Sequence, residues 1–520
     1  MKINFNEVKN IDVVFINPSV GSNYQQLKNK YTSIEPPTWS LLLAQSMRKF
    51  GFSVAIIDVN AENLSNAEVY DRIKILNPRL VCFVVYGQNV NAGTTNMEGA
   101  SDLSKYIKLQ NKNLTISFIG SHIQALPTQT LKQEDSIDII FTNEGVYALK
   151  NLLNLDNFHE KYLSDVNGIG FRKNNSIQIN LPEKVVPNER MDIDLPGYAW
   201  DLLPYKEKPL DLYRSPMWHA EYDENKRTPY AAIQTSLGCQ FRCSFCMINI
   251  INRNDNEDIG VSSNYSGMRF WSPEFIFKEF RKLIDLGVET IRIVDEMFLL
   301  NPKYYIPLCK KLSELNKNDS LRMWAYSRID TVKNPEVLKL VRGAGIKWLA
   351  LGIESGNKKV RLEVTKGKFE DVDVENVVKQ IHNADIEVMA NYIYGLPGDT
   401  KETIEETFKL SLKLCTSGWN TYAAMALPGS LLYKQALEKG SELPKTYSGY
   451  SFHGYETVCL STATLKNWEV LKLRDEAFIR YHTNKNFLER IEKKFGTDEK
   501  NNIINMSKLK LKRKIIEENS

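Results

Sequence analysis

Three closely spaced cysteines are the residues best suited to chemistry in this chain. Cys239, Cys243 and Cys246 form a CxxxCxxC pattern directly after an apolar run at Ala231–Thr235. Thiolates are soft ligands, and iron-sulfur clusters are held by cysteine thiolates. Three such ligands would leave one iron of a four-iron, four-sulfur cluster open. The pattern therefore predicts a reactive cluster in a loop at the end of a strand.

A structural zinc site is the alternative for the same three thiols. Such a site needs a fourth ligand, and the nearest upstream candidate, His219, lies twenty residues away in a proline-rich stretch. Seven cysteines, an odd number with three bunched together, do not suggest a disulfide framework. The other four are predicted to be small buried side chains: Cys82, Cys309, Cys415 and Cys459.

The first 155 residues alternate between strand and helix patterns. Apolar runs predict strands at Val13–Ile16, Val54–Val59, Leu80–Val85, Leu114–Ile119 and Ile137–Phe141. Helical patterns lie between them at Trp39–Phe50, Asp102–Leu109 and Leu126–Lys132. This alternation predicts a Rossmann-like parallel sheet with helices on both faces.

Ligands of such sheets bind outside the carboxyl ends of the strands. The loops expected at that edge contain Asn17-Pro18, Tyr86-Gly87, Gly120-Ser121-His122 and Glu144-Gly145. Turn formation alone would explain each glycine. No GxGxxG follows the first strand, which disfavours a dinucleotide.

Residues 156–227 are predicted to form an irregular linker. Gly168–Arg172 and Ile177–Asn180, joined at Asn174-Asn175, have the pattern of a small hairpin. Repeated prolines and aromatic residues follow, and this composition is too aromatic for a free linker. We expect the segment to pack between two domains.

Strand-helix alternation resumes from residue 228 to residue 430. Further strands are predicted at Thr290–Val294, Leu321–Ala325, Trp348–Leu351, Val388–Tyr394 and Thr421–Ala426. Six units fit a partial (βα)6 TIM-type barrel, whose active residues would lie on the carboxyl-terminal rim with the cysteine loop. Residues 431–520 are predicted to form a small C-terminal helical region, so the whole chain is of α/β class.

The charge balance does not exclude any fold, but it limits the kinds of binding partner that we expect. There are 67 basic and 63 acidic residues, a net charge of +4, so no global charge favours nucleic acid. No apolar run reaches the roughly 18 residues that span a bilayer, and Met1–Lys9 does not resemble a signal peptide. A cytoplasmic protein is expected. The basic run Lys508–Lys514 is interpreted as a solvated helix face or frayed tail.

At the cysteines the chain resembles the radical S-adenosylmethionine (SAM) superfamily. The superfamily pattern CxxxCx(aromatic)C is met with Phe245 in the aromatic position. Further motifs of the superfamily recur in order at the strand ends: Asp295-Glu296, Ser327-Arg328, Gly352-Ile353-Glu354-Ser355-Gly356 and Gly395-Leu396-Pro397-Gly398. These motifs have no reason to surround a zinc site, so they favour the cluster.

The resemblance implies that the three cysteines bind three irons and that SAM chelates the fourth. An electron from a donor such as flavodoxin or ferredoxin then breaks a carbon-sulfur bond and gives a 5′-deoxyadenosyl radical. The resemblance assigns six contacts with SAM: Phe245 beside adenine, Glu296 and Glu354 at the ammonium or ribose hydroxyls, Arg328 at the carboxylate, and Gly395 and Pro397 in a turn near adenine. Barrel packing, rim salt bridges and a purely structural turn are the corresponding alternatives.

A Rossmann-like domain ahead of such a barrel resembles the cobalamin-binding domain of cobalamin-dependent radical SAM enzymes. The contacts expected with cobalamin are Pro18, Tyr86, Gly120, His122, Glu144 and Gly145. The DxHxxG motif that supplies a histidine below cobalt in many cobalamin proteins is absent, and Gly120-Ser121 replaces the usual Gly-Gly. In this subgroup the position of His122 more often borders the corrin than ligates cobalt.

The resemblance implies a methyltransferase that acts on an unactivated carbon through a 5′-deoxyadenosyl radical and methylcobalamin. Rearrangement, cyclisation or oxidation with the same cofactors is one alternative, and a non-catalytic corrinoid-binding protein is another. A methylthiotransferase is disfavoured because that family has three cysteines in its first domain, where this chain has only Cys82. The substrate, a small molecule or a peptide, stays open.

Overall fold

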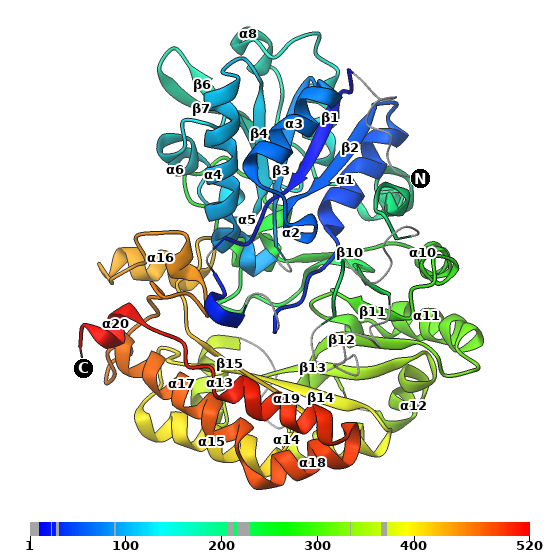
Figure 1. Cartoon of the computed structure of the whole chain (residues 1–520), viewed down its shortest axis with the longest axis vertical. Helices are drawn as coiled ribbons and strands as arrows, with labels where there is room; N and C mark the ends of the chain where they lie inside the picture. The colour runs from blue at the N-terminus through cyan, green and yellow to red at the C-terminus, as the bar shows by residue number, and fades with distance from the viewer. Residues whose placement is uncertain are drawn as a thin grey trace.

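The computed structural model describes residues 10–21, 23–27, 31–87, 90–205, 212–215, 229–332, 334–365 and 372–519. His219 and the first nine residues lie outside these ranges. Two α/β halves are stacked along the long axis of the molecule, with the N-terminal domain above and the barrel below (Figure 1). The C-terminal helices lie across the lower half (Figure 1).

The upper half contains a seven-stranded sheet of order β2-β1-β3-β4-β5-β6-β7. Its five parallel strands are β1 Val13–Asn17, β2 Val54–Asp58, β3 Leu80–Val85, β4 Ile116–Gly120 and β5 Ile139–Phe141. They are buried along nearly their whole length, as expected for a sheet with helices on both faces. The predicted Rossmann-like sheet is confirmed.

The helices of this domain include α1 Thr38–Lys49, α3 Asn66–Leu76, α4 Gly93–Gln110, α5 Ser121–Ala125, α6 Pro127–Gln133 and α7 Val146–Leu153. Helix α4 begins well before the predicted Asp102. Its first half buries polar side chains such as Thr94, Asn96 and Ser101. Buried polar residues hide the apolar periodicity by which a helix is recognised in a sequence.

The hairpin expected in the linker is part of the N-terminal sheet. Strands β6 Ile169–Lys173 and β7 Ser176–Ile179 are joined at Asn174 and Asn175, whose φ angles are 48° and 62°. Two left-handed residues suit a two-residue hairpin turn. Because β6 pairs antiparallel with β5, the sheet runs past residue 155.

The lower half contains six parallel strands in the order β15-β14-β13-β12-β11-β8. Their bounds are β8 Tyr230–Ile233, β11 Thr290–Ile293, β12 Arg322–Arg328, β13 Ile346–Glu354, β14 Glu387–Tyr394 and β15 Gly418–Ala423. The outer helices are α10 Pro273–Asp285, α11 Pro302–Leu315, α12 Pro335–Gly343, α13 Lys358–Thr365, α14 Val374–Asn383 and α15 Lys401–Leu414. The predicted partial (βα)6 barrel is confirmed.

The base of the barrel lumen is closed by apolar side chains. Trp324, Trp348 and Met389 form one buried cluster on the inner face of the strands. Phe495, the last residue of α18 Lys485–Phe495, stacks on Trp348 with ring centroids 5.7 Å apart. The C-terminal region therefore seals the lumen from below, and the open end faces the N-terminal domain.

The other C-terminal helices are α16 Leu431–Glu438, α17 Asn467–His482, α19 Thr497–Ser507 and α20 Lys514–Glu517. Arg513 lies in the basic run that we expected to be solvated, but it is only 2% exposed. Its guanidinium pairs with Asp475 and donates to the carbonyls of Phe452 and Gly454. The expectation is wrong for this residue, because a half-buried carboxylate and backbone carbonyls balance its charge. The lysines of the run are exposed.

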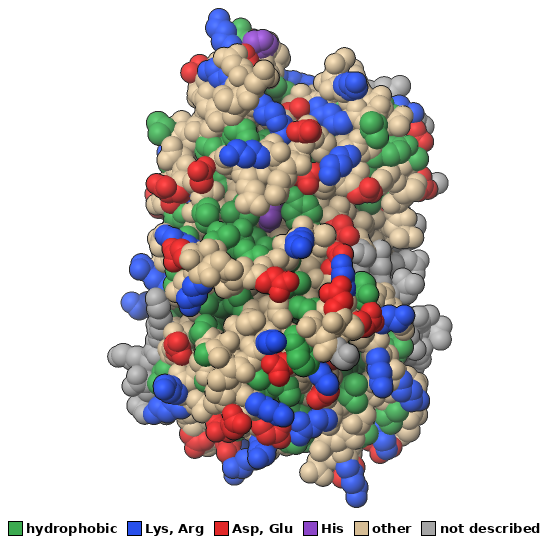
Figure 2. Space-filling model, turned by 90° about the vertical axis from the view of Figure 1, so that its left-hand side faces the viewer, with side chains coloured by type: hydrophobic (Ala, Val, Ile, Leu, Met, Phe, Trp, Pro, Cys, Tyr) green, Lys and Arg blue, Asp and Glu red, His purple; other side chains and the backbone are tan. Residues whose placement is uncertain are grey.

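Charged side chains of both signs are intermixed on the face of the molecule shown in Figure 2, and hydrophobic side chains gather near mid-height. Among the described residues, no helix combines the length and the apolar character that a membrane crossing requires.

Glu499 in α19 makes stability depend on pH. Burial raises the pKa of this carboxyl from 4.5 to about 7, and both of its oxygens lack a hydrogen-bond partner among the described residues. The folded state keeps the proton where the unfolded state has lost it, so stability falls as pH rises from about 4.5 to 7. Glu499→Gln is expected to stabilise the fold at pH 8 by about 1–3 kcal/mol and to change little at pH 5. Thermal unfolding at both pH values measures this, and an equal gain at both would contradict it.

Candidate active site between the two domains

The cysteine loop begins on a short strand rather than in the loop predicted from the sequence. Strand β9 Ser236–Cys239 pairs antiparallel with β10 Gly267–Phe270. Gly238 has φ +81°, and a Cβ there would lie 2.2 Å from the carbonyl oxygen of Gly267. Asn249 Oδ1 accepts a 2.7 Å hydrogen bond from the backbone N–H of Cys239. The backbone therefore holds the first cysteine in place.

The three thiols lie close enough to act on one another electrostatically. Cys239 is influenced by Cys246, and Cys243 by Cys239. Burial raises the pKa of Cys239 and of Cys243 to about 12, and raises the pKa of Cys246 further. Such buried thiols ionise only beside positive charge, which metal ions supply.

No three His, Cys, Asp or Glu side chains in the described ranges are grouped as ligands of a single metal ion. An iron-sulfur cluster instead distributes its thiolate ligands over separate irons. His219, the candidate fourth ligand for zinc, lies outside the described ranges. Three neighbouring thiols, one buried and two half-buried, are a donor set that fits a cluster.

Arg328 at the end of β12 lies against the cysteine loop. Its guanidinium is 3.5 Å from the ring centroid of Phe241 and lowers the pKa of Cys243 against the effect of burial. Its Nε and Nη2 donate to the two carboxylate oxygens of Asp330 at 2.6 and 2.5 Å. The rim salt bridge that the sequence left open is therefore present.

Glu354 is aimed into the rim by an unusual backbone. Its φ is +63°, and the register between β13 and β14 shifts between Gly352 and Glu354. A Cβ on Gly352 would lie 2.5 Å from Glu354 Oε1, so the glycine makes room for the carboxylate. Burial raises the pKa of Glu354 to about 7, with Arg328 opposing the rise.

Glu296 follows β11 on the same rim. Burial raises its pKa to about 7, while Arg292 acts in the opposite direction. Glu296 acts electrostatically on Cys239 and Cys246, as Glu354 does on Cys243. The structure thus brings both predicted glutamates and Arg328 to the cysteines.

Phe245 packs against the predicted adenine turn. Its ring contacts a small apolar cluster that includes Leu396. Gly395 has φ +79° and donates its N–H to Asp399 Oδ2 at 3.0 Å, and a Cβ on it would lie 2.5 Å from Val470 Cγ1 in α17. Pro397 is half-buried. The turn therefore has a packing role in addition to any contact with SAM.

A cavity of about 570 Å³ opens beside the cysteine loop. Phe241 and Arg328 form its wall towards the cysteines, and apolar residues of α11 and α12 form much of the remainder. The cavity connects the surroundings of the thiols with the outer helices of the barrel.

Sequence reasoning missed the polar residues that fasten this loop. Asn91 Oδ1, in the N-terminal domain, accepts a 3.1 Å hydrogen bond from the N–H of Met247. Asp295 accepts from the backbone and hydroxyl of Thr235 and from the Ser236 hydroxyl at 2.5–2.6 Å. Asp295 is part of a motif that the sequence analysis named. No local pattern indicates Asn91, because its partner Met247 is 156 residues away in the chain.

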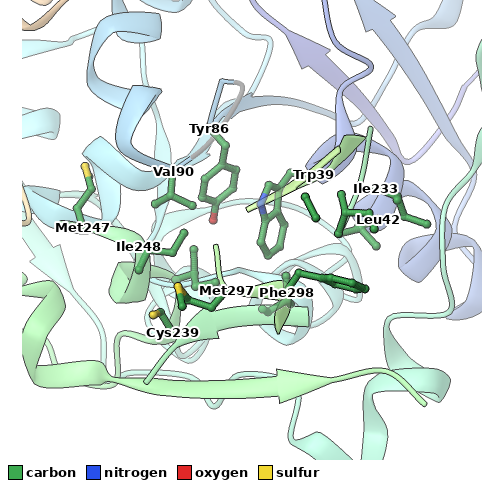
Figure 3. Close-up of a cluster of buried hydrophobic side chains, with 14 of the residues drawn as sticks. Trp39, Leu42, Tyr86, Val90, Ile233, Cys239, Met247, Ile248, Met297 and Phe298 are labelled. Carbon is green, nitrogen blue, oxygen red and sulfur yellow. The ribbon is translucent and has the colours of Figure 1, made fainter. Parts of the chain in front are cut away.

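Two aromatic side chains mark the edge of the N-terminal sheet that faces the barrel. Tyr86 stacks on Trp39 with ring centroids 4.7 Å apart. Figure 3 shows both rings pointing from the N-terminal domain towards Cys239, Met297 and Phe298 of the barrel. The seam between the domains therefore runs between the predicted cobalamin edge and the cysteine loop.

Pro18 and Gly120 lie at this edge of the sheet. Pro18 follows β1 and is buried. A Cβ on Gly120 would lie 2.2 Å from the carbonyl oxygen of Val85, so the close approach of β3 and β4 already requires glycine there. The glycine is explained by the fold alone, whether or not cobalamin contacts it.

His122 is only 3% exposed. Its Nδ1 lies 3.2 Å from Thr94 Oγ1, and its ring makes an edge contact with Tyr447. Burial lowers its pKa to about 4, so the imidazole is neutral near pH 7.

Glu144 joins segments of the chain in the seam. Its Oε1 accepts a 2.6 Å hydrogen bond from Val186 N–H, and its carboxylate pairs with Arg269 at 2.6 Å. Gly145 follows with φ +79° at the start of α7. Glu144 is therefore held by a hydrogen bond at Oε1 and by an ion pair at Oε2, which favours a role in joining the domains.

Three buried polar atoms near the sheet edge have no hydrogen-bond partner among the described residues. They are Trp39 Nε1, His122 Nε2 and Gln124 Oε1. Unpaired buried donors and acceptors are costly, so each calls for a ligand or ordered water. Cobalamin carries amide side chains that both donate and accept, so this edge fits a corrin.

Two family models match the chain in succession. The B12 binding domain matches residues 25–153, and the Radical SAM superfamily matches residues 233–411. They coincide with the Rossmann-like domain and with most of the barrel.

Curated relatives and solved structures agree with these matches. "Uncharacterized methyltransferase PH0819" of Pyrococcus horikoshii is 26% identical over 80% of this chain and 82% of its own. "Anaerobic magnesium-protoporphyrin IX monomethyl ester cyclase" of Cereibacter sphaeroides is 24% identical over 77% of this chain and 59% of its own. The fold matches that of the radical SAM methyltransferase TsrM from Kitasatospora setae with a TM-score of 0.59, 14% identity and coverage of 83% and 78% of the two chains.

The fold and the cysteine loop together define an enzyme that uses an iron-sulfur cluster and SAM. Residues 233–411 form a radical SAM domain, and a B12-binding domain at residues 25–153 precedes it. Its cofactors are a [4Fe-4S] cluster, SAM and cobalamin.

Proposed function

We propose that this protein is a cobalamin-dependent radical SAM methyltransferase that acts on an unactivated carbon. The observation that carries the proposal is the single seam shared by the cysteine loop and the edge of the N-terminal sheet, where Asn91 accepts from Met247 at 3.1 Å. A methyl carrier and a radical source must face one substrate, and a shared seam provides this. Relatives named as methyltransferases support it.

When bound, the cluster and SAM supply a 5′-deoxyadenosyl radical, and cobalamin carries the methyl group. Glu296 and Glu354 are proposed to meet the ammonium or ribose hydroxyls of SAM, where carboxylates accept hydrogen bonds. Arg328, already paired with Asp330, presents positive charge to the SAM carboxylate and to the thiolates. Phe245 and the turn at Gly395 and Pro397 are proposed to border adenine.

Tyr86 and His122 are proposed to border the corrin, and Pro18, Gly120 and Gly145 to shape its edge. Trp39 and Gln124 join this set because their unpaired polar atoms lie at the same edge. Glu144 is proposed to act on cobalamin only indirectly, because Val186 and Arg269 engage both of its oxygens.

The proposed substrate is a small molecule or a peptide, and the proposed electron source is a protein such as flavodoxin or ferredoxin. A cytoplasmic location is proposed, because reducing conditions there preserve thiols. All seven cysteines are free in the structure.

The test separates the two uses of SAM. Anaerobically reconstituted protein with a strong reductant is expected to form S-adenosylhomocysteine only when cobalamin is bound, and 5′-deoxyadenosine only when the cluster is bound. With substrate, equal amounts of the two products are expected, and chromatography with mass spectrometry quantifies them. If cobalamin-loaded protein forms only 5′-deoxyadenosine, the reaction is a non-methylating one. If it forms neither, the protein is a non-catalytic corrinoid binder.

A further inference from the structure

The barrel lumen contains a buried ion pair that none of the proposed cofactor contacts uses. Arg292 lies on the inner face of β11 and is 4% exposed. It pairs through Nη1 with Glu35, which precedes α1 in the N-terminal domain. A loop of one domain thus places a carboxylate inside the barrel of the other.

The guanidinium of Arg292 is held by aromatic rings. It lies 5.0 Å from the ring centroid of Trp324 and 4.9 Å from that of Tyr326, and Nη2 donates to the Tyr326 hydroxyl. Cation–π contacts of this kind fix the plane of the group. Its Nε has no hydrogen-bond partner among the described residues, so one donor is left over.

The wall around the pair is polar and retains accessible surface. Four polar side chains of the barrel strands are only half-buried: Tyr326, Tyr422, Asn391 and Asn420. Asn420 Nδ2 donates a hydrogen bond to Asn391 Oδ1 at 3.3 Å. Burial raises the pKa of Tyr422, and the nearby positive charge of Arg292 lowers it. Hydroxyl and amide groups therefore line the lumen above its apolar base.

Aromatic side chains of other segments lie near Arg292 and Tyr422. Tyr24, from the segment between β1 and α1, stacks on His453 with ring centroids 5.6 Å apart. Phe452 lies 4.9 Å from the ring of Tyr422. Side chains of the barrel strands, the N-terminal domain and the C-terminal region thus meet around Arg292.

The pair lies next to the place proposed for SAM. Arg292 precedes Glu296 by four residues on the same strand and its continuation, and the two interact electrostatically. Glu296 in turn acts on Cys239 and Cys246. A molecule held at Arg292 would therefore lie near the residues proposed to hold SAM.

Charge balance decides which molecule suits the pair. A substrate with only a carboxylate would bring a second negative charge to a guanidinium that already balances Glu35, and burying that net charge is strongly unfavourable. A substrate with only an ammonium group would leave the guanidinium unpaired. A molecule with both groups replaces one ion pair with two and leaves no charge unpaired.

We propose that Arg292 and Glu35 anchor the substrate, and that this substrate is a small zwitterion of the amino-acid type. Its carboxylate pairs with Arg292 and its ammonium group with Glu35, while the tyrosine and asparagine side chains contact the remainder. This inference rests on the proposed function and names the substrate class for it. SAM carries the same two groups, but the resemblance to radical SAM enzymes assigns them to the open iron beside the cysteines, so they would not be available to this pair.

Binding without turnover tests the proposal. Anaerobically reconstituted protein with saturating SAM and no reductant is titrated by calorimetry with each standard L-amino acid. For each one that binds, the N-acetyl derivative and the methyl ester are titrated as well. At least one amino acid is expected to bind, and each derivative at least tenfold more weakly. The proposal is overturned if no amino acid binds, or if the derivatives bind equally well.

The double variant Glu35→Gln/Arg292→Gln tests the residues themselves. Either single change would leave a buried charge unpaired, whereas the double change keeps a neutral polar pair of similar size. The preference for the amino acid over its derivatives is expected to disappear. In the control Arg322→Gln, the lost pair with Glu289 is part-exposed at the start of β12, and the preference should persist. A double variant that keeps the preference overturns the assignment.

Iron and cobalt contents, measured on every sample, report folding and cofactor binding. Wild-type protein that holds both cofactors and cleaves SAM, but binds no amino acid, contradicts only the substrate class. Wild-type protein that cannot bind cobalamin or cleave SAM contradicts the proposed function instead.

Discussion

Cys243→Ala is expected to abolish cleavage of SAM completely. Cys243 is the middle of three thiols that influence one another, and its removal leaves only two ligands for the cluster. The positive neighbour Arg328 cannot substitute for a ligand. Iron and sulfide analysis should show loss of the [4Fe-4S] cluster, and chromatography should detect no 5′-deoxyadenosine.

Cys309→Ala is the matched control for this variant. Cys309 is a buried cysteine of α11 that packs in the apolar core. Its replacement should leave the iron content and SAM cleavage near the wild-type values. Retention of a full cluster and of cleavage in Cys243→Ala would show that these three thiols are not the ligands.

Arg513→Ala is expected to destabilise the protein by about 2–4 kcal/mol, because it leaves buried carbonyl acceptors without a donor, while Asp475 keeps its ion pair with Arg474. Arg513 Nε lies 2.8 Å from Asp475 Oδ2, and its Nη atoms donate to Gly454 O, Thr457 Oγ1 and Phe452 O at 2.9–3.0 Å. The change removes all of these bonds at once. Chemical denaturation followed by fluorescence measures the loss.

Lys510→Ala is the control within the same basic run. Lys510 is exposed, so its replacement should change stability by no more than about 0.5 kcal/mol. If Arg513→Ala is as stable as Lys510→Ala, the buried arrangement of the tail is not the one populated in solution.

Strands and helices with strong local patterns could be predicted from the sequence. Leu80–Val85 is a strand with the predicted bounds, and Ser272 caps α10 with Pro273 at its first position. The hairpin at Asn174-Asn175 could also be predicted, but its pairing with strand β5 of the N-terminal sheet could not. Local periodicity reports the conformation of a segment, whereas the strand with which it pairs depends on residues far away in the chain.

The same distinction separates the predicted site residues. Glu296, Arg328 and Glu354 are found at the cysteines, because strand-end motifs of a barrel meet on one rim. Glu144 was expected at cobalamin and is engaged by Arg269, a partner from another part of the chain. A contact of Trp39 with cobalamin could not be predicted, because in the sequence Trp39 is only one of several apolar residues of a helix.

The segment between β1 and α1 connects all the parts of the active site. Gln25 Nε2 donates to the carbonyls of His453 and Lys512 in the C-terminal region, and Ile34 bridges Arg214. Glu35 then enters the lumen, and Trp39 follows at the seam. Exchange of this segment would therefore replace Glu35 while leaving the cysteines unaltered, so a graft between relatives would change the proposed substrate anchor without redesign of the barrel.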